Sequence, residues 1–488
     1  RNPASVMKLL TTLVALEKLG PTYRWKTEIY LRGGIEEDRL AGDLLLKGYG
    51  DPFLVTERLW SMLRAVRRAG ISTIEGDLLL DDSHFDVGDY DPGAFDNQPL
   101  RAYNVAPSAL LMNFKVVRFQ FEPDVASAMI NLRLDPALDN LQVVNQLSLK
   151  DGRCGGYQRG ITITPNATVD RMIFSGAFPS GCRSYAMDRT VLSHNEFAYG
   201  LFKSLWQEMG GTLDGGWRNV QATGDEEPIV TFESLPLTDI IASVNKHSNN
   251  VMARQLVYTL GAEAFGPPGT ADKGKQVVDH WLAERGFEFP ELEFDNGAGL
   301  SRVSRLTASH LGDLLRYAWY SPLMPEFVAS MSLSGLDGTL SRRFRSEGLA
   351  GRAHMKTGSL DHVAAIGVRP AELRYYLTAA HYRSRIDYSD DALRERLAEA
   401  IEKLPDLSLE ATILGVGVGE LLPQHRVLGL GPSDDEPDVD EDALCKRRGA
   451  NAENGKCPSK QRKRATACHG SLILLFRAEE FDLVIPGD

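Results

Sequence analysis

The chain has 488 residues, of which 43% are apolar, and its 54 Lys and Arg against 66 Asp and Glu give a net charge of −12. This composition supplies enough apolar surface for about two or three folded domains and excludes a chain that is disordered throughout. The acidic balance argues against a nucleic-acid-binding protein. No apolar run approaches the roughly 18 residues of a membrane span, so we expect no transmembrane segment.

The first segment predicts a helix. Met7, Leu10 and Val14 recur at helical spacing within residues 5–19, and Gly20 with Pro21 ends the pattern. The chain begins at Arg1 rather than Met, so we expect a processed form or a fragment whose signal peptide lies outside this sequence.

Residues 31–234 predict a β-rich region, because short apolar runs are broken by Gly, Asp and Asn. The sequence Gly-Asp-Leu-Leu-Leu occurs twice, at 42–46 and 76–80, and predicts two similar strands. Cys154 and Cys182 lie in the same region and are able to pair, which favours an oxidising compartment.

The second half predicts helices followed by strands. Helical spacing covers 237–256, 274–285 and 307–317, strand-like runs cover 352–356, 363–368 and 374–380, and 391–404 predicts an amphipathic helix. This order indicates an α+β fold in which helices flank an antiparallel sheet. Residues 405–488 differ: seven acidic residues in 434–442 and eight basic ones in 446–464 are typical of a solvated, disordered tail.

Several familiar motifs are absent or incomplete. There is no His-Glu-x-x-His and no Gly-x-Ser-x-Gly. The Gly-x4-Gly-Lys match at 269–275 is followed by Gln276, where a P-loop needs Ser or Thr for magnesium. We therefore expect no metal site and no nucleotide or other cofactor.

The first motif with chemical potential is Ser5-Val6-Met7-Lys8 at the start of the first helix. Residues three apart lie on one helix face, so Lys8 can accept the proton of Ser5 if burial and a second cation lower its pKa by about three units from ~10.4. About one Ser-x-x-Lys is expected by chance in a chain this long, and a second copy occurs at Ser243 and Lys246.

The second motif is Ser248-Asn249-Asn250, inside the helical block. Ser248 is able to pass protons between two lysines, and Asn250 is able to hold a substrate amide. This motif is common at junctions between helices and loops, so it is weak evidence by itself.

The third motif is Lys356-Thr357-Gly358-Ser359, at the end of a strand-like run. Gly358 permits close backbone approach, and a peptide substrate can add beside such a strand. Lys356 and the hydroxyls of Thr357 and Ser359 suit a substrate carboxylate.

In this order, the three motifs resemble the signature of serine penicillin-recognising enzymes. More narrowly, the chain closely resembles the class C low-molecular-mass penicillin-binding proteins, the D-Ala-D-Ala carboxypeptidase/endopeptidases. The resemblance covers 1–404 and rests on the three motifs and on segments 2–9, 23–27, 48–52, 76–85, 103–107 and 295–302.

The resemblance implies a fold and a domain organisation. It implies a penicillin-binding-protein/β-lactamase-like transpeptidase domain, in which helices flank an antiparallel sheet. Ser5 and Ser248 lie 243 positions apart, which is far more than in compact members of that superfamily. We therefore expect a discontinuous catalytic domain of 1–30 and 235–404, an inserted β-rich region at 31–234 and an atypical charged tail at 405–488.

The resemblance also implies a serine DD-peptidase that cleaves D-Ala-D-Ala in peptidoglycan stem peptides, is acylated by β-lactams and works in the periplasm or elsewhere in the cell envelope. Ser5 would be the nucleophile, Lys8 its base, and Ser248 a proton relay linked to both Lys8 and Lys356. The backbone N–H groups of Ser5 and Ser359 would hold the oxyanion. Tyr103 and Arg302 are candidates for lining the pocket.

Two alternatives share these motifs. A β-lactamase would need a dedicated carboxylate base for deacylation and usually has a smaller insertion. A non-catalytic protein that binds peptidoglycan or senses β-lactams would need no turnover at all.

Overall fold

The computed structural model describes residues 1–154, 160–222, 226–345 and 350–360, and the backbone of strand segments 363–368, 378–381, 411–412 and 475–476. The chain divides into two compact units, Arg1–Ser384 and Arg385–Asp488. In the second unit the described residues are β18 (Ala411–Thr412) and β19 (Leu475–Phe476), which pair antiparallel. The predicted helix at 391–404 and the rest of the charged tail lie outside the described residues.

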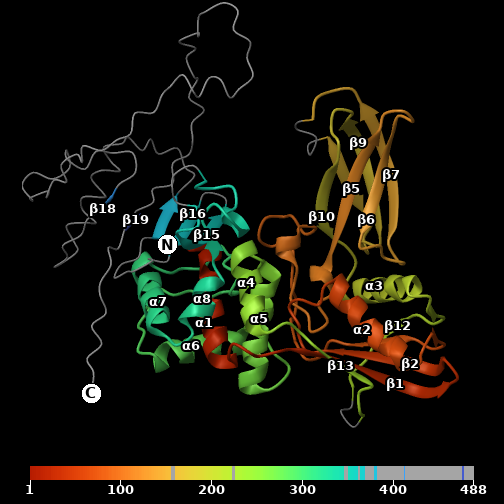
Figure 1. The fold of residues 1–488 in the computed structure, drawn as a ribbon, viewed down its shortest axis with the longest axis horizontal. Coiled ribbons are helices and arrows are strands. Elements are labelled where there is room, and N and C mark those ends of the chain that lie inside the picture. Colours follow the sequence, from red (N-terminus) through yellow and green to blue (C-terminus); the bar gives the residue numbers. More distant parts are fainter. Residues whose placement is uncertain are drawn as a thin grey trace, which may run out of the picture. The chain divides into compact units, whose positions relative to one another are not determined.

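The first helix packs against helices from the other half of the chain. The 3-10 turn η1 (Ala4–Met7) leads directly into α1 (Lys8–Leu19), which contacts α4 (Leu237–His247), α5 (Asn250–Phe265) and α6 (Ala271–Glu284). Figure 1 shows the red α1 among these green helices. Two more helices follow, α7 (Ala308–Tyr320) and α8 (Met324–Ala329). Their shared apolar core includes Leu10, Val14, Leu256 and Trp281, all fully buried.

The chain that follows these helices forms a four-stranded antiparallel sheet. Its strand order is β14 (Ser332–Leu333), β15 (His354–Leu360), β16 (Val363–Val368) and β17 (Thr378–His381). The short turn η5 (Gly338–Leu340) precedes β15, and β15 itself packs against η1. The predicted strand at 363–368 is therefore found with its predicted bounds, and the sheet is antiparallel as predicted.

The middle of the chain contains a seven-stranded mixed sheet. Its strands are β1 (Lys26–Glu36), β2 (Arg39–Gly48), β3 (Thr73–Ile74), β4 (Leu78–Asp81), β11 (Thr212–Leu213), β12 (Trp217–Asn219) and β13 (Val230–Glu233). The two Gly-Asp-Leu-Leu-Leu segments form β2 and β4, which are parallel neighbours with Leu44 opposite Leu78. The prediction of two similar strands is confirmed.

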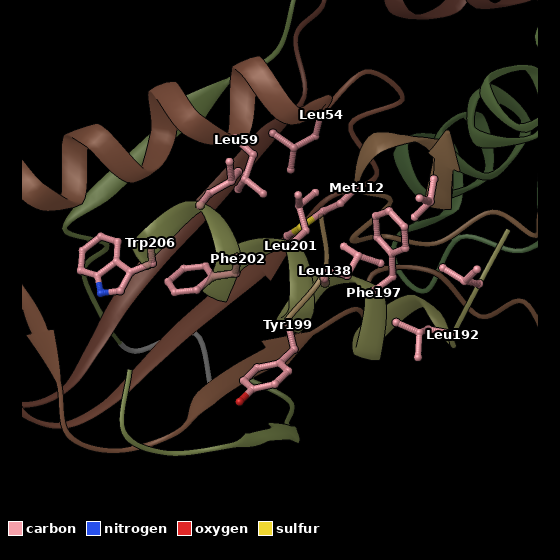
Figure 2. Packing of buried hydrophobic residues seen from close by; sticks show 14 of the residues in the cluster. Leu54, Leu59, Met112, Leu138, Leu192, Phe197, Tyr199, Leu201, Phe202 and Trp206 are labelled. Atoms are coloured by element: carbon pink, nitrogen blue, oxygen red, sulfur yellow. The ribbon is translucent and has the colours of Figure 1, made fainter. Parts of the chain in front are cut away.

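Two helices of this region were not predicted. Helix α2 (Thr56–Arg68) connects β2 to β3, and α3 (His194–Glu208) precedes β11. Figure 2 shows Leu59 of α2 in one hydrophobic cluster with Phe197, Phe202 and Trp206 of α3. Parallel strands need a crossover, which explains why helix α2 lies between the two similar strands.

Two three-stranded sheets complete the middle region. In the first, β5 (Val116–Asp124) lies between β10 (Tyr185–Thr190) and β6 (Met129–Asp135). In the second, β9 (Arg171–Pro179) lies between β7 (Gln142–Lys150) and β8 (Ile161–Pro165). Phe119 of β5 contacts Phe174 of β9, with ring centroids 4.8 Å apart. Cys154 and Cys182, which the sequence indicated are able to pair, form a disulfide.

The α+β prediction is confirmed, because helices and a separate antiparallel sheet form the half that contains the three sequence motifs. Two short turns, η2 (Ala102–Asn104) and η3 (Asn113–Lys115), bring the middle region toward α5. Within the described residues, no helix is both long and apolar enough to cross a membrane.

Candidate active site

The Ser-x-x-Lys motif lies where the 3-10 turn becomes an α-helix. Ser5 belongs to η1 and Lys8 is the first residue of α1. Their spacing brings Ser5 Oγ within 2.9 Å of Lys8 Nζ. Ser5 is partly exposed, whereas Lys8 is fully buried. The hydroxyl therefore remains accessible while the amino group lies behind it, shielded from solvent.

Lys8 Nζ has three close polar neighbours. Besides Ser5, they are Asn250 Oδ1 and the carbonyl oxygen of Ala298, each at 2.6 Å. Burial is the main reason that the pKa of Lys8 lies well below its usual value, and the nearby charges of Lys356 and Arg254 lower it further. This surrounding favours the neutral amine, which is the form able to act as a base.

The Ser-x-Asn motif forms the tight junction between α4 and α5. Ser248 ends α4 in the left-handed conformation, with φ 56° and ψ 37°. Asn249 then caps α5 by accepting a hydrogen bond from the N–H of Met252. This local geometry turns Asn250, the first residue of α5, toward Lys8.

The Lys-Thr-Gly motif lies on β15, and the burial of its side chains differs from residue to residue. Lys356 is fully buried, Thr357 is partly exposed and Ser359 is exposed. Lys356 Nζ donates to Ser248 Oγ at 2.8 Å and to the carbonyl of Thr357 at 2.7 Å. Burial lowers the pKa of Lys356 to about 7, so this lysine titrates near neutral pH.

Gly358 allows β15 to approach the turn that carries Ser5. A Cβ at this position would lie 2.8 Å from the carbonyl oxygen of Pro3 and 3.1 Å from the backbone nitrogen of Val6. Any side chain would therefore push the strand away from η1. The close backbone approach that we expected at Gly358 is therefore an approach to η1, at the start of the first helix.

The proton relay differs in one contact from the expectation. Ser248 accepts a hydrogen bond from Lys356, but within the described part of the chain Lys8 makes none to Ser248. Asn250 occupies that position on Lys8 instead. The physical reason is local: the left-handed turn at Ser248 directs its hydroxyl toward β15 and the following Asn250 toward α1.

Tyr103 and Arg302 lie at the edge of this arrangement, Tyr103 on η2 of the middle region and Arg302 on the segment between α6 and α7. The Tyr103 hydroxyl donates to Asp96 at 2.7 Å, and its backbone carbonyl accepts from Asn250 Nδ2 at 3.4 Å. The Arg302 guanidinium lies 4.2 Å from the centre of the Phe95 ring. Neither side chain has a described hydrogen bond to Ser5, Lys8 or Lys356.

Two groups in the surroundings of Lys8 were not predicted from the sequence. The carbonyl of Ala298 reaches Lys8 because Gly299 has φ 71° and its missing Cβ would lie 1.8 Å from the carbonyl oxygen of Ala4. A backbone carbonyl leaves no signal in a sequence. Arg254 was also missed, although its position four residues after Asn250 places both on one face of a helix.

A pocket of about 530 Å³ adjoins Ser248 and Asn250. Its opposite wall comes from the middle region and includes Tyr103, Phe114 and Arg118. No group of three or more His, Cys, Asp or Glu side chains that is suited to a metal ion occurs among the described residues.

Comparisons with known proteins identify a family and relatives of this chain. The D-Ala-D-Ala carboxypeptidase 3 (S13) family matches residues 1–370. The D-alanyl-D-alanine carboxypeptidase of Actinomadura sp. (strain R39) is 31% identical over 380 residues, which cover 75% of this chain and 70% of that protein. The D-alanyl-D-alanine carboxypeptidase DacB of Haemophilus influenzae is 24% identical over 363 residues, which cover 74% and 75% of the two chains.

Solved structures show the same fold. Penicillin binding protein 4 (dacB) from Haemophilus influenzae has a TM-score of 0.67 at 22% identity, covering 80% of this chain and 87% of that chain. A second structure of that protein, complexed with a β-lactam, has a TM-score of 0.63 at 21% identity and covers 80% and 86%. Since the family match extends over residues 1–370, well beyond half of the chain, the chain belongs to the D-Ala-D-Ala carboxypeptidase 3 (S13) family.

Proposed function

We propose that this protein is a serine DD-peptidase that cleaves the D-Ala-D-Ala bond of peptidoglycan stem peptides through an acyl-enzyme on Ser5, and that β-lactams acylate the same residue. Membership of the S13 family supports the reaction class. The β-lactam complex of the Haemophilus relative supports acylation by these compounds.

The surroundings of Lys8 carry the proposal. A neutral amine has two N–H donors and one lone pair. Asn250 Oδ1 and the Ala298 carbonyl are acceptors, so they take the two N–H groups. The third neighbour, Ser5 Oγ at 2.9 Å, is the one that carries a proton to give. The lone pair of Lys8 therefore faces the Ser5 hydroxyl, as a general base requires.

The first half of the reaction forms the acyl-enzyme. Ser5 Oγ bonds to the carbonyl carbon of the substrate while its proton moves to Lys8 Nζ. The oxyanion that forms on the carbonyl oxygen is held by the backbone N–H groups of Ser5 and Ser359, and each such donor typically contributes about 3 kcal/mol. The carbon–nitrogen bond then breaks.

Lys356 and Ser248 serve the leaving group. In its charged form Lys356 donates to Ser248 Oγ, and Ser248 passes a proton to the departing D-Ala nitrogen. The same charge, with the Thr357 and Ser359 hydroxyls, suits the substrate carboxylate. Water then attacks the carbonyl carbon of the ester, Ser5 Oγ leaves and takes back the proton held by Lys8, and the proton released by the product carboxylic acid restores the charge of Lys356.

Two hydrophobic cores support the domain organisation that we propose. One hydrophobic cluster joins α1 mainly to residues from 237 onward and also includes Phe85 and Ala109, and the other lies within 29–213. We therefore assign 1–30 with 235–404 to the catalytic domain and 31–234 to the insertion. Tyr103 and Arg302 lie where the loop of the insertion meets the site, and we assign them to the pocket wall, with Arg302 facing an acidic group of the peptide.

An extracytoplasmic location suits this function, since peptidoglycan lies outside the cytoplasmic membrane. The Cys154–Cys182 disulfide supports an oxidising compartment. We propose the periplasm or another part of the cell envelope.

Fluorescent penicillin labelling of Ser5→Ala tests the proposal. We expect covalent labelling to disappear, because the nucleophilic oxygen is lost. Ser243→Ala is a matched control, since Ser243 belongs to the second Ser-x-x-Lys, whose Lys246 is paired with Asp337 instead. Labelling that survives Ser5→Ala would overturn the assignment.

Release of D-Ala from a diaminopimelate pentapeptide, with and without penicillin, separates the proposal from its alternatives. A penicillin-sensitive release is the expected result. Rapid turnover of a chromogenic cephalosporin would indicate a β-lactamase, and labelling without D-Ala release would indicate a binding or sensing protein.

A further inference from the structure

Arg254 is a buried cation without a described ion-pair partner. It is 3% exposed, and within the described residues no carboxylate lies within ion-pairing distance of it. Its Nε is also buried without a hydrogen-bond partner. Leaving a charge in this state is costly, because burial removes its hydration and no counter-ion replaces it. Such a residue calls for a functional explanation.

The contacts of Arg254 lead to the active site. Its Nη1 donates to the backbone carbonyls of Tyr103 at 3.0 Å and Val105 at 2.8 Å. The Tyr103 carbonyl also accepts a hydrogen bond from Asn250 Nδ2. The Oδ1 atom of the same Asn250 amide accepts a hydrogen bond from Lys8 at 2.6 Å. Arg254 and Asn250 therefore lie on one face of α5 and both donate hydrogen bonds to the carbonyl of Tyr103.

We propose that Arg254 is a positioning residue for acylation: it fixes the Tyr103–Val105 segment of the insertion on α5 and thereby holds the Asn250 amide against the amino group of Lys8. This inference rests on the proposed function, because it assigns Arg254 a task in the same reaction. It also gives the insertion a direct part in shaping the catalytic base.

The charge of Arg254 makes a second contribution. After burial and the charge of Lys356 on β15, it is the next cause of the lowered pKa of Lys8. Lys8 otherwise contacts only uncharged groups, namely Ser5, Asn250 and the Ala298 carbonyl. The groups that face Arg254 in turn are Tyr90, Tyr258 and the carboxylate of Asp295. The positive charge thus favours neutral Lys8.

Three substitutions separate the two contributions. Arg254→Lys keeps a donor and the charge, Arg254→Gln keeps a donor without the charge, and Arg254→Met loses both. The measurement is the second-order rate constant of acylation by a fluorescent penicillin between pH 5 and 9. Arg316→Gln removes an exposed arginine of α7 and serves as the control, with no expected change.

We expect Arg254→Met to slow acylation at least about tenfold, since an active general base contributes at least that much. In Arg254→Gln the acidic limb of the pH profile should move to higher pH, because the pKa of Lys8 rises when the nearby charge is gone. In Arg254→Lys that limb should stay in place. If the role of Arg254 were purely structural, the Arg254→Gln and Arg254→Lys variants would have the same pH profile of acylation.

Identical pH profiles for Arg254→Gln and Arg254→Lys would overturn the electrostatic part, and an unchanged rate in folded Arg254→Met would overturn the positioning part. Circular dichroism and thermal unfolding report whether each variant is folded. If Arg254→Met is unfolded, an Arg254→Gln variant that acylates like the wild type throughout would contradict the inference. Labelling of the wild type at Ser5 tests the proposed function separately.

Discussion

Two fully buried lysines share this site, and their neighbours suit them to opposite charge states. Lys8 is surrounded by two acceptors and one hydroxyl, with Lys356 and Arg254 as nearby cations. Lys356 donates to a hydroxyl and a carbonyl, and burial brings its pKa to about 7. A neutral base and a charged proton donor can therefore coexist near neutral pH.

Lys356→Met should stabilise the fold in a pH-dependent way. The pKa of Lys356 is about 7 when folded but about 10.4 when unfolded, so between these values the unfolded chain binds more protons and this group's contribution to stability rises with pH. Removing the lysine should therefore raise the free energy of unfolding by about 3 kcal/mol at pH 6, because the pKa difference amounts to about 5 kcal/mol and about 2 kcal/mol is subtracted for two lost hydrogen bonds.

This gain should shrink above about pH 7 and reach zero at about pH 9, and at about pH 10 the variant should be the less stable protein, because the lost hydrogen bonds then outweigh the remaining penalty of burying Lys356. Thermal unfolding of both proteins at several pH values measures it. Lys246→Met is the control, because Lys246 is paired with Asp337 and its removal should not stabilise the protein. A gain that is constant over the whole pH range would contradict the explanation.

Gly358→Ala should impair acylation without removing any reacting group. The added methyl would lie too close to Pro3 and Val6, so β15 must move away from η1 and carry the Ser359 N–H with it. Misplacement of about 1 Å can cost roughly 100-fold in rate, and we expect a loss of that order. Gly34→Ala is a matched control, since a Cβ at Gly34 would meet nothing within 4 Å. Equal penicillin acylation rates for both variants would refute this role of Gly358.

At the scale of elements, the repeated Gly-Asp-Leu-Leu-Leu shows what local sequence can predict. Two runs of the same residues prefer the same backbone and bury the same side chains, so both form strands that pair in register. The α2 helix between them was overlooked, although Leu59, Met62, Leu63 and Val66 are buried at helical spacing. The many charged residues on its other face obscured that periodicity.

The disulfide lies in the middle region, and its loss should destabilise that region. Cys154 and Cys182 are 28 positions apart, and closing a loop of this length typically stabilises a fold by about 3 kcal/mol. Replacing both by Ser should lower the melting temperature while leaving penicillin acylation at 25 °C unchanged, since neither cysteine contacts the three motifs. An unchanged melting temperature would contradict this, and reduction of the wild type should reproduce the loss.

At the scale of the whole molecule, the sequence was sufficient to predict which side chains lie together at the candidate site. Ser5, Lys8, Ser248, Asn250 and Lys356 were predicted as site residues, and the structure joins them in two hydrogen-bonded groups, Ser5–Lys8–Asn250 and Ser248–Lys356. Which lysine would contact Ser248 could not be predicted, because it depends on the left-handed turn after α4. The position of the Ala298 carbonyl could not be predicted either, because tertiary contacts determine the path of its loop.

The carbonyl of Ala298 and the amide of Asn250 reach Lys8 across 290 and 242 positions of chain. During synthesis, a ribosome must therefore release most of the polypeptide before the first helix can acquire these neighbours. Until then the amine keeps ordinary basicity, and the adjacent hydroxyl is inert. Antibiotic capture should accordingly be the last property that a nascent or refolding molecule gains, so its time course would report completed maturation.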